Sequence, residues 1–205
     1  MCSSDLWAKQ ASGNGRENIS DGPLTEACFA QPSGLTSNGS TLYVADSEVS
    51  AIRAVPLDGK GDVKTVVGEG LFEFGDVDGL GNQVRLQHAL GVAYHEGKLY
   101  VADTYNSKIK VIDPPKRSCT TFLGGKAEGW LAGAVLSEPA GLSIAGDKMY
   151  IADTNNHRIR VVDLKSKAIS TLELHGIEAP KLAQGTNPPE SSNPGQTTKK
   201  TDKRE

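Results

Sequence analysis

The chain has 205 residues, of which 37% are hydrophobic and 23% charged, and its formal net charge is -3. This length allows one domain with some additional chain, and the 23 glycines and 10 prolines favour many short strands over a few long helices. The balance of charge excludes an overall basic field for nucleic acid. No apolar run approaches the roughly 18 residues of a membrane-spanning helix, and no secretory signal is visible at the start.

In chain order, residues 1–19 show no periodicity and are interpreted as a disordered or foreign leader. Residues 20–176 are predicted to form the folded part, as three units at about 20–70, 71–130 and 131–176. Residues 177–205 are polar and rich in proline and charge, which predicts a disordered linker or tail.

Three segments within the folded part match one another. They are LYVADSEVSAIRAV from Leu42, LYVADTYNSKIKVID from Leu99 and MYIADTNNHRIRVVD from Met149. A glycine lies 12 residues before the aspartate of each copy, which pairs Gly34 with Asp46, Gly91 with Asp103, and Gly141 with Asp153. A constant core with connections of variable length is typical of a repeat fold.

Each copy reads as four short strands separated by turn residues. The LYVAD and MYIAD strands are apolar on both faces, so each sheet needs cover on both sides. Small residues at matching positions (Ala45, Ala102 and Ala152) suit close contact between sheets. These features predict an all-β protein, a β-propeller of four-stranded antiparallel blades, with about three blades present.

The pattern P-x-G-L followed by LYVAD-T/S and I-R/K-V resembles the NHL repeat, and ADTNNHRIRVVD is the copy most similar to it. FAQPSGL, LFEFGDVDGLG and TLELHGIEAPK further resemble the propeller of NHL-repeat proteins that also carry a thioredoxin-like domain, in animals and in plants. The plant members suppress quenching in chloroplasts. The resemblance covers about residues 20–180 and implies a propeller with more blades than three, so we expect the chain to be a fragment. The third copy lacks the Asp-Gly that precedes the other two, at Asp21 and Asp78.

The repeated aspartates are expected to be structural. Each closes a strand before a turn, where its carboxylate can accept hydrogen bonds from backbone N–H groups two or three residues on. Asp153 is expected to pair with Arg158, and Asp103 with Lys108. We predict no catalytic, cofactor-binding or metal-binding residue, and we assign the repeat positions to architecture: Gly34, Asp46, Gly91, Asp103, Gly141, Asp153 and Arg158.

Three weaker signals are kept as alternatives. Asp76 and Asp78 hint at a calcium loop, although Leu80 and Gln87 occupy later ligand positions. A propeller enzyme of the lyase or lactonase type needs histidines and acids that converge. An RNA-binding surface needs a basic stripe, for which the candidates are Arg53, Lys108, Lys110, Arg158 and Arg160.

The chain has three cysteines, Cys2, Cys28 and Cys119, and no C-x-x-C pair. This pattern predicts free thiols rather than a disulfide framework or a zinc site. A reducing compartment such as the cytoplasm is favoured, with the chloroplast as the alternative if the chain is of the plant type.

We expect a non-catalytic scaffold for protein–protein interaction, which in full length accompanies a thioredoxin-like redox domain. The expected partner is a protein and not a nucleic acid, and three blades leave faces that can self-associate.

Overall fold

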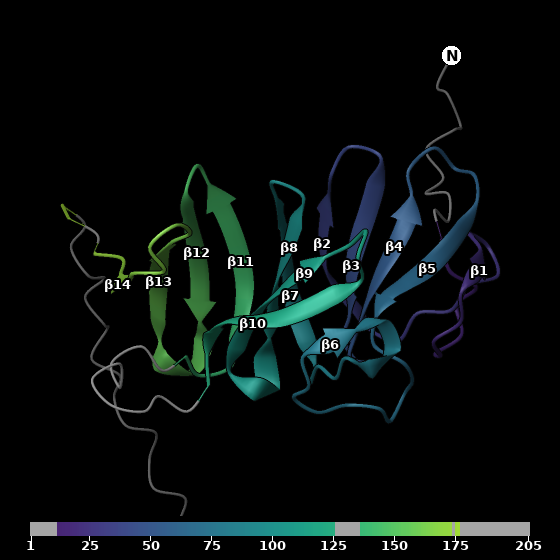
Figure 1. Ribbon diagram of the computed structural model, residues 1–205, viewed down its shortest axis with the longest axis horizontal. Coiled ribbons are helices and arrows are strands. Elements are labelled where there is room, and N and C mark those ends of the chain that lie inside the picture. Colours follow the sequence, from purple (N-terminus) through teal and green to yellow (C-terminus); the bar gives the residue numbers. More distant parts are fainter. Residues whose placement is uncertain (1–11, 126–135, 174, 177–205) are drawn as a thin grey trace, which may run out of the picture. The chain divides into compact units, whose positions relative to one another are not determined.

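The computed structural model describes residues 12–125, 136–173 and 175–176. Residues up to Leu172 belong to one compact unit, shown in Figure 1, and a second unit begins at Glu173. Of the second unit the structure describes only Glu173, His175 and Gly176, so the fold described below is that of the first.

Three antiparallel sheets make up the first unit, and each is built from one repeat. Sheet 1 has the strand order β1-β5-β4-β3-β2, sheet 2 the order β6-β10-β9-β8-β7, and sheet 3 the order β11-β12-β13-β14. The strands of sheet 1 are β1 (Gly22–Pro23), β2 (Pro32–Ser37), β3 (Thr41–Asp46), β4 (Ala51–Pro56) and β5 (Asp62–Val67). Those of sheet 2 are β6 (Gly79–Leu80), β7 (Ala89–His95), β8 (Lys98–Asp103), β9 (Lys108–Asp113) and β10 (Ser118–Gly124). Those of sheet 3 are β11 (Pro139–Ala145), β12 (Lys148–Asp153), β13 (Arg158–Asp163) and β14 (Ile169–Thr171).

The helical content of the described residues consists of single 3-10 turns. They are η1 (Gly81–Gln83), η2 (Thr104–Asn106) and η4 (Thr154–Asn156). The last two link the second and third strands of their repeats, and each ends on a left-handed residue, Ser107 or His157, with φ of 54°. Within the described residues, no helix is long and apolar enough to cross a membrane.

The four strands expected for each repeat are confirmed, and sheets 1 and 2 also gain a two-residue strand that the sequence did not predict. β1 pairs with β5 and β6 pairs with β10. Both additions begin at the glycine of the Asp-Gly pair that the third repeat lacks. Asp21 accepts hydrogen bonds from the backbone N–H and the hydroxyl of Thr65, and Asp78 accepts the same pair from Thr121. The carboxylate therefore holds the extra strand against the outer edge.

The N-terminal boundary lies earlier than expected. Residues 12–19 were assigned to a loose leader, but Gly13 N–H donates to Leu24 O at 2.7 Å, and Glu17 forms a bridge with Phe29. Backbone hydrogen bonds across 12 or so residues are not a property of a free leader, so the prediction is wrong for 12–19. Residues 1–11 and the predicted tail at 177–205 lie outside the described residues.

The sheets pack face to face in chain order, as Figure 1 shows. One buried cluster joins Tyr43, Ala45 and Ile52 of sheet 1 to the apolar side chains of sheet 2, among them Leu99 and Val101. A second cluster joins sheet 2 to sheet 3 and contains Ala102, Ile109, Met149, Ile151 and Val162. Sheet 2 is covered on both faces, by sheet 1 and by sheet 3, as the sequence predicts for these strands.

The repeated glycines allow the sheets to come this close. A Cβ on Gly34 would lie 2.5 Å from Leu90 O, and one on Gly91 would lie 2.0 Å from Ala140 O. Real Cβ atoms do not approach a backbone oxygen so closely, and thus only glycine fits at these two positions. At Gly141 the nearest atom to an added Cβ is Ala152 Cβ at 3.8 Å, because no sheet covers that side.

Candidate interaction surfaces

The three repeated aspartates are fully buried and each one fastens the start of its own repeat. The Asp46 carboxylate accepts a hydrogen bond from the backbone N–H of Ala30 at 2.7 Å. Asp103 accepts one from Gln87 at 2.7 Å, and Asp153 accepts one from Ser137 at 2.8 Å. The backbone N–H groups that bind these carboxylates are not the expected ones. The N–H groups lie 16 residues earlier in the chain, not in the following turn, because the first and second strands pair and place the preceding segment beside the aspartate.

The expected ion pairs are not those that form. Asp153 pairs with Arg160 at 2.9 Å and not with Arg158, which is exposed. Lys108 binds Asp76 and not Asp103. Arg158 and Arg160 lie on the same face of β13, because residues two apart in a strand share a face, and Arg160 is the one that is buried.

Each sheet in fact holds one buried cation at the same position of its third strand. Arg53 and Lys110 are 0% exposed and Arg160 is 7% exposed. Arg53 donates to Asp46, to Asp21 and to the carbonyls of Ser20 and Cys28. The sequence carried a usable signal that was missed. A cation between apolar neighbours, in a strand that needs cover on both faces, must be buried and therefore paired.

These positions rule out the basic stripe. Three of its five candidates, Arg53, Lys110 and Arg160, are buried against acids, so they present no continuous charge to a phosphate backbone. Of the other two, Lys108 is bound to Asp76 and only Arg158 is exposed. The RNA-binding alternative loses the surface on which it depended.

The Asp76–Asp78 pair is built around an amine. Lys110 Nζ lies 2.7 Å from Asp76 Oδ1, 2.7 Å from Asp78 Oδ1 and 3.0 Å from Thr121 Oγ1. These lysine contacts hold the pKa of both carboxyl groups below the ordinary value, although partial burial opposes them. The Lys110 ammonium group thus occupies the position between the two carboxylates at which the calcium alternative requires a metal ion.

Burial has the largest effect on the pKa of two of the repeated aspartates. It raises the pKa of Asp46 and of Asp103 to about 6, with hydrogen bonds from Ala30 and from Asn106 and Gln87 acting in the opposite direction. Burial likewise raises the pKa of the Cys119 thiol to about 12. Such a thiol is protonated at neutral pH and is not an activated nucleophile.

The raised pKa of Asp103 predicts a pH dependence of stability. Its unfolded pKa is near 3.8, so between about pH 4 and 6 the folded state binds more protons than the unfolded state. The contribution of Asp103 is therefore largest below about pH 4 and is lost as the pH rises through 6. Urea unfolding at several pH values, compared between the wild type and Asp103→Asn, should show a shallower decline for the variant over this window. Equal slopes in the two proteins would contradict the assignment.

The histidines lie apart. His88 stacks on Tyr105 with ring centroids 4.4 Å apart and places Nε2 3.4 Å from Glu48. His95 faces Glu96 at 3.9 Å, and His157 occupies the exposed turn of sheet 3. His175 belongs to the second unit. In the part of the chain that the structure describes, no group of three or more His, Cys, Asp or Glu side chains is arranged to hold a metal ion.

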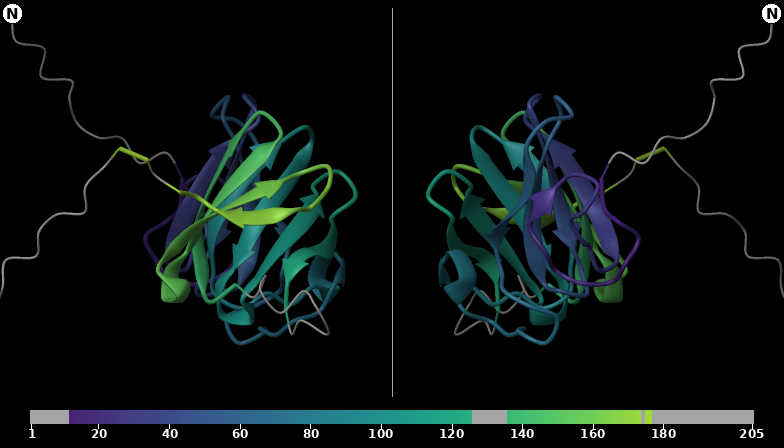
Figure 2. Two further views of the ribbon diagram at one scale, coloured as in Figure 1. Left: turned by 90° about the vertical axis from the view of Figure 1, so that its left-hand side faces the viewer. Right: turned by 90° about the vertical axis from the view of Figure 1, so that its right-hand side faces the viewer.

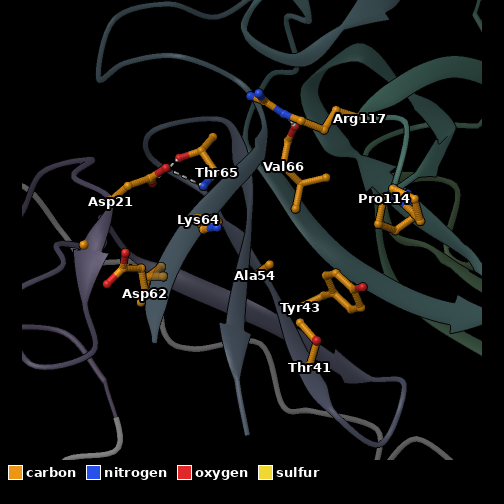
Figure 3. A pocket seen from close by; sticks show the side chains of 13 residues that line it. Asp21, Thr41, Tyr43, Ala54, Asp62, Lys64, Thr65, Val66, Pro114 and Arg117 are labelled. Carbon is orange, nitrogen blue, oxygen red and sulfur yellow. Dashed lines mark hydrogen bonds between the residues drawn. The ribbon is translucent and has the colours of Figure 1, made fainter. Parts of the chain in front are cut away.

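A groove of about 550 Å³ opens between sheets 1 and 2 (Figure 3). Tyr43 projects into it from β3, and Arg117 crosses from sheet 2 to donate to Val66 O at 3.0 Å. Asp21 lies at its edge with its carboxylate on Thr65 and Arg53. Within the groove the Thr65 hydroxyl donates to the Asp21 carboxylate at 2.7 Å, at the point where β1 pairs with β5.

Within residues 12–125 and 136–172, no sheet covers the outward face of sheet 3, toward which Figure 2 (left) looks. Tyr150, Ala152, Thr154 and Ile159 form this face, which we call the trailing face of sheet 3. Ile159 is 46% exposed, and Ala152 and Thr154 are exposed as well. The matching residues of sheet 2 are covered by sheet 3, and their identities are the same: Tyr100, Ala102, Thr104 and Ile109.

The opposite face of sheet 1 is also partly open. Leu35 on this leading face is 59% exposed, whereas Val92, its counterpart in sheet 2, is 5% exposed. The leading face includes an apolar hollow of about 460 Å³ between Leu24, Phe29 and Leu42. Figure 2 (right) views the unit from this side. Both ends of the array therefore present apolar sheet surface.

Three matching antiparallel sheets, each packed on the next, define a β-propeller-type repeat protein. Residues 136–162 match the family model of the NHL repeat. NHL repeat-containing protein 2 of Bos taurus is 48% identical over 149 residues, which are 65% of this chain and 20% of that protein. Protein SUPPRESSOR OF QUENCHING 1 of Arabidopsis thaliana is 46% identical over 187 residues, 82% of this chain and 18% of that protein. The chain is an NHL-repeat protein, and it spans about a fifth of the length of these relatives.

Solved structures support the fold alone. An auxiliary nutrient binding protein from Bacteroides ovatus matches with a TM-score of 0.53 and 21% identity, over 66% of this chain and 36% of its own. A streptogramin B lyase matches with a TM-score of 0.51 and 12% identity, over 77% of this chain and 46% of its own.

Proposed function

We propose that the chain is a non-catalytic scaffold that binds proteins. The observation that carries the proposal is the segment between β5 and β6, where Phe72 is 85% exposed and Phe74 is 53% exposed. Exposed apolar side chains that lie together mark interaction sites in folded proteins.

A non-enzymatic role is supported by the chemistry of the described residues. The histidines point to separate neighbours, the buried acids are bound to backbone N–H groups and to buried cations, and burial keeps the Cys119 thiol protonated. The lyase likeness rests on fold at 12% identity, and a fold hosts many activities.

The resemblance to longer NHL-repeat proteins extends this proposal. In the full-length protein the sheets would accompany a thioredoxin-like domain and hold its partners nearby. This chain has no C-x-x-C pair of its own. The coding sequence upstream tests the point, because a thioredoxin-like segment with paired cysteines is expected there and its absence would remove this part of the proposal.

Site-specific photocrosslinking tests the scaffold function directly. A photoreactive amino acid replaces Phe72 in one form of the chain and the exposed Lys116, on the turn between β9 and β10, in another. We expect a discrete protein adduct from position 72 in cells that express the chain, and none from position 116. Identical patterns from the two positions, or no adduct at 72, would overturn the proposal.

A further inference from the structure

The junction of sheets 2 and 3 shows what fills the space between two neighbouring sheets near their outer strands. Phe122 of β10 packs there, with its ring edge-on to Tyr100 at a centroid distance of 5.2 Å. Lys167, on the turn between β13 and β14, places its ammonium group 5.1 Å from the centre of the same ring. An aromatic ring is thus held between a tyrosine of its own sheet and a cation from the turn of the next sheet.

The junction of sheets 1 and 2 has the same frame with smaller side chains. The residue that follows the threonine bound to the Asp-Gly aspartate is Phe122 in sheet 2 and Val66 in sheet 1. On the neighbouring strand, Ala54 stands at the position of Val111. Both substitutions remove apolar volume from one place, and the groove of about 550 Å³ lies there. This volume is in the range of pockets that bind ligands.

The tyrosine and the cation that hold the ring have counterparts in this groove. Tyr43 corresponds to Tyr100 in the strand register. Arg117 corresponds to Lys167, since both lie four residues after the aspartate that ends the preceding strand and both have a left-handed backbone. Figure 3 shows both groove residues, with Val66 beside Arg117. The groove therefore offers the two contacts of an aromatic ring and has no aromatic residue of its own at the Phe122 position.

Arg117 is held in place by its own backbone and side chain. Its Nε donates to Val66 O at 3.0 Å, and its carbonyl accepts the N–H of Gly81 at 2.8 Å. Within the described residues, no hydrogen bond uses the two terminal nitrogens of the guanidinium. These nitrogens are therefore available to a ligand, and they suit a carboxylate that approaches end-on.

The charges of the groove favour an acidic occupant. Its cations are Arg117 and Lys64, and its acids are Asp21 and Asp62. In the part of the chain that the structure describes, neither cation has an acidic side chain within 4.0 Å. The Asp21 carboxylate is already bound to a buried arginine and to a threonine of sheet 1. Two unpaired cations therefore face one unpaired acid.

We propose that the groove between sheets 1 and 2 binds a peptide segment of a partner protein in which an aromatic residue stands next to an acidic one. The aromatic ring enters the space between Tyr43, Val66 and Arg117, as Phe122 does in the junction of sheets 2 and 3. The acidic side chain binds the terminal nitrogens of Arg117. The groove shares no residue with the segment between β5 and β6 that carries the proposed function, so it is a second binding site.

Selection of phage-displayed random peptides tests the proposal. The library is first depleted on Val66→Phe, which fills the groove with the ring that Phe122 supplies in sheet 2, and is then selected on the wild-type chain. The enriched peptides should share an aromatic residue beside aspartate or glutamate. No enrichment, or a shared motif without an aromatic residue, would overturn the proposal.

Fluorescence polarisation with synthetic forms of the enriched peptides measures each contact. Alanine in place of the aromatic residue should weaken binding about tenfold or more, because one large apolar side chain is no longer buried. Ala54→Val, which narrows the groove as Val111 does in sheet 2, should also weaken binding. Arg117→Gln should lose more affinity than Arg117→Lys, whereas Lys116→Ala, on the same turn but outside the groove, should change nothing. Equal affinity for the wild type, Ala54→Val and Arg117→Gln would place the peptides elsewhere and contradict the proposal.

Two controls keep the outcome clear. Thermal unfolding should show Val66→Phe to be as stable as the wild type, because Phe122 fits the same frame; if this variant does not fold, Ala54→Val takes its place in the depletion step. The photocrosslink at position 72 separates the two sites. An adduct at 72 without groove peptides sinks this inference alone, and groove peptides without an adduct at 72 sink only the proposed function of the segment between β5 and β6.

Discussion

Gly91→Ala should lower the free energy of unfolding by about 3 kcal/mol, at the upper end of what overpacking costs. The added Cβ would lie 2.0 Å from Ala140 O, and it would also approach Ala102 Cβ at 3.4 Å. Both neighbours belong to packed sheets, so relief requires that sheets 2 and 3 separate and expose the buried cluster around Ile109 and Met149. Urea unfolding followed by circular dichroism measures the change.

Gly141→Ala is the matched control, because it makes the same change in the same repeat motif where no sheet covers it. Its free energy of unfolding should stay within about 0.5 kcal/mol of the wild type. Equal losses in the two variants would mean that the glycine serves the register shift within its own strand pair and not the approach of the next sheet.

Arg53→Met should cost about 3–5 kcal/mol, the range found when one partner of a buried ion pair is removed. The change leaves Asp46 buried without its cation and removes the bonds to Asp21 and to the carbonyls of Ser20 and Cys28. The guanidinium also lies 5.0 Å from the centre of the Phe29 ring, and this contact between a cation and an aromatic ring is lost when methionine replaces the arginine. Thermal and urea unfolding should both report the loss.

Two further variants show whether the buried charge is the cause. Arg158→Met, at an exposed residue that begins β13, should change stability by less than about 0.5 kcal/mol. Adding Asp46→Asn to Arg53→Met should recover part of the loss, because an amide oxygen can still accept the Ala30 N–H and carries no charge. A double variant as unstable as the sum of the two single variants would contradict this explanation.

The fold was accessible from the sequence because local patterns fix it. Apolar and polar residues do not alternate along the LYVAD segments, which indicates strands that need cover on both faces. The distance from Gly34 to Asp46 recurs in each copy and indicates a repeated set of antiparallel strands. The packing of Ala45 and Ala102 between sheets confirms this reasoning. The extra strand after Asp21 was not predicted, because two residues carry no periodicity and only the hydrogen bonds with Thr65 hold them in place.

The partners of the aspartates depended on tertiary structure. Asp103 accepts an N–H 16 residues before it, and Lys110 binds acids more than 30 residues before it, so no local rule for turns or strand neighbours could find them. The same holds for the start of the ordered region, where residue 13 bonds to residue 24 and not to a sequence neighbour.

The sequence by itself determined the repeat, the four strands of each copy and the need for stacked sheets, since side-chain alternation and turn residues act over a few positions. Only the tertiary structure decided which cations are buried, which glycines meet another backbone and which faces stay open. These properties depend on what a neighbouring sheet covers: in the part of the chain that the structure describes, sheet 3 lies over Ile109 and no sheet lies over Ile159.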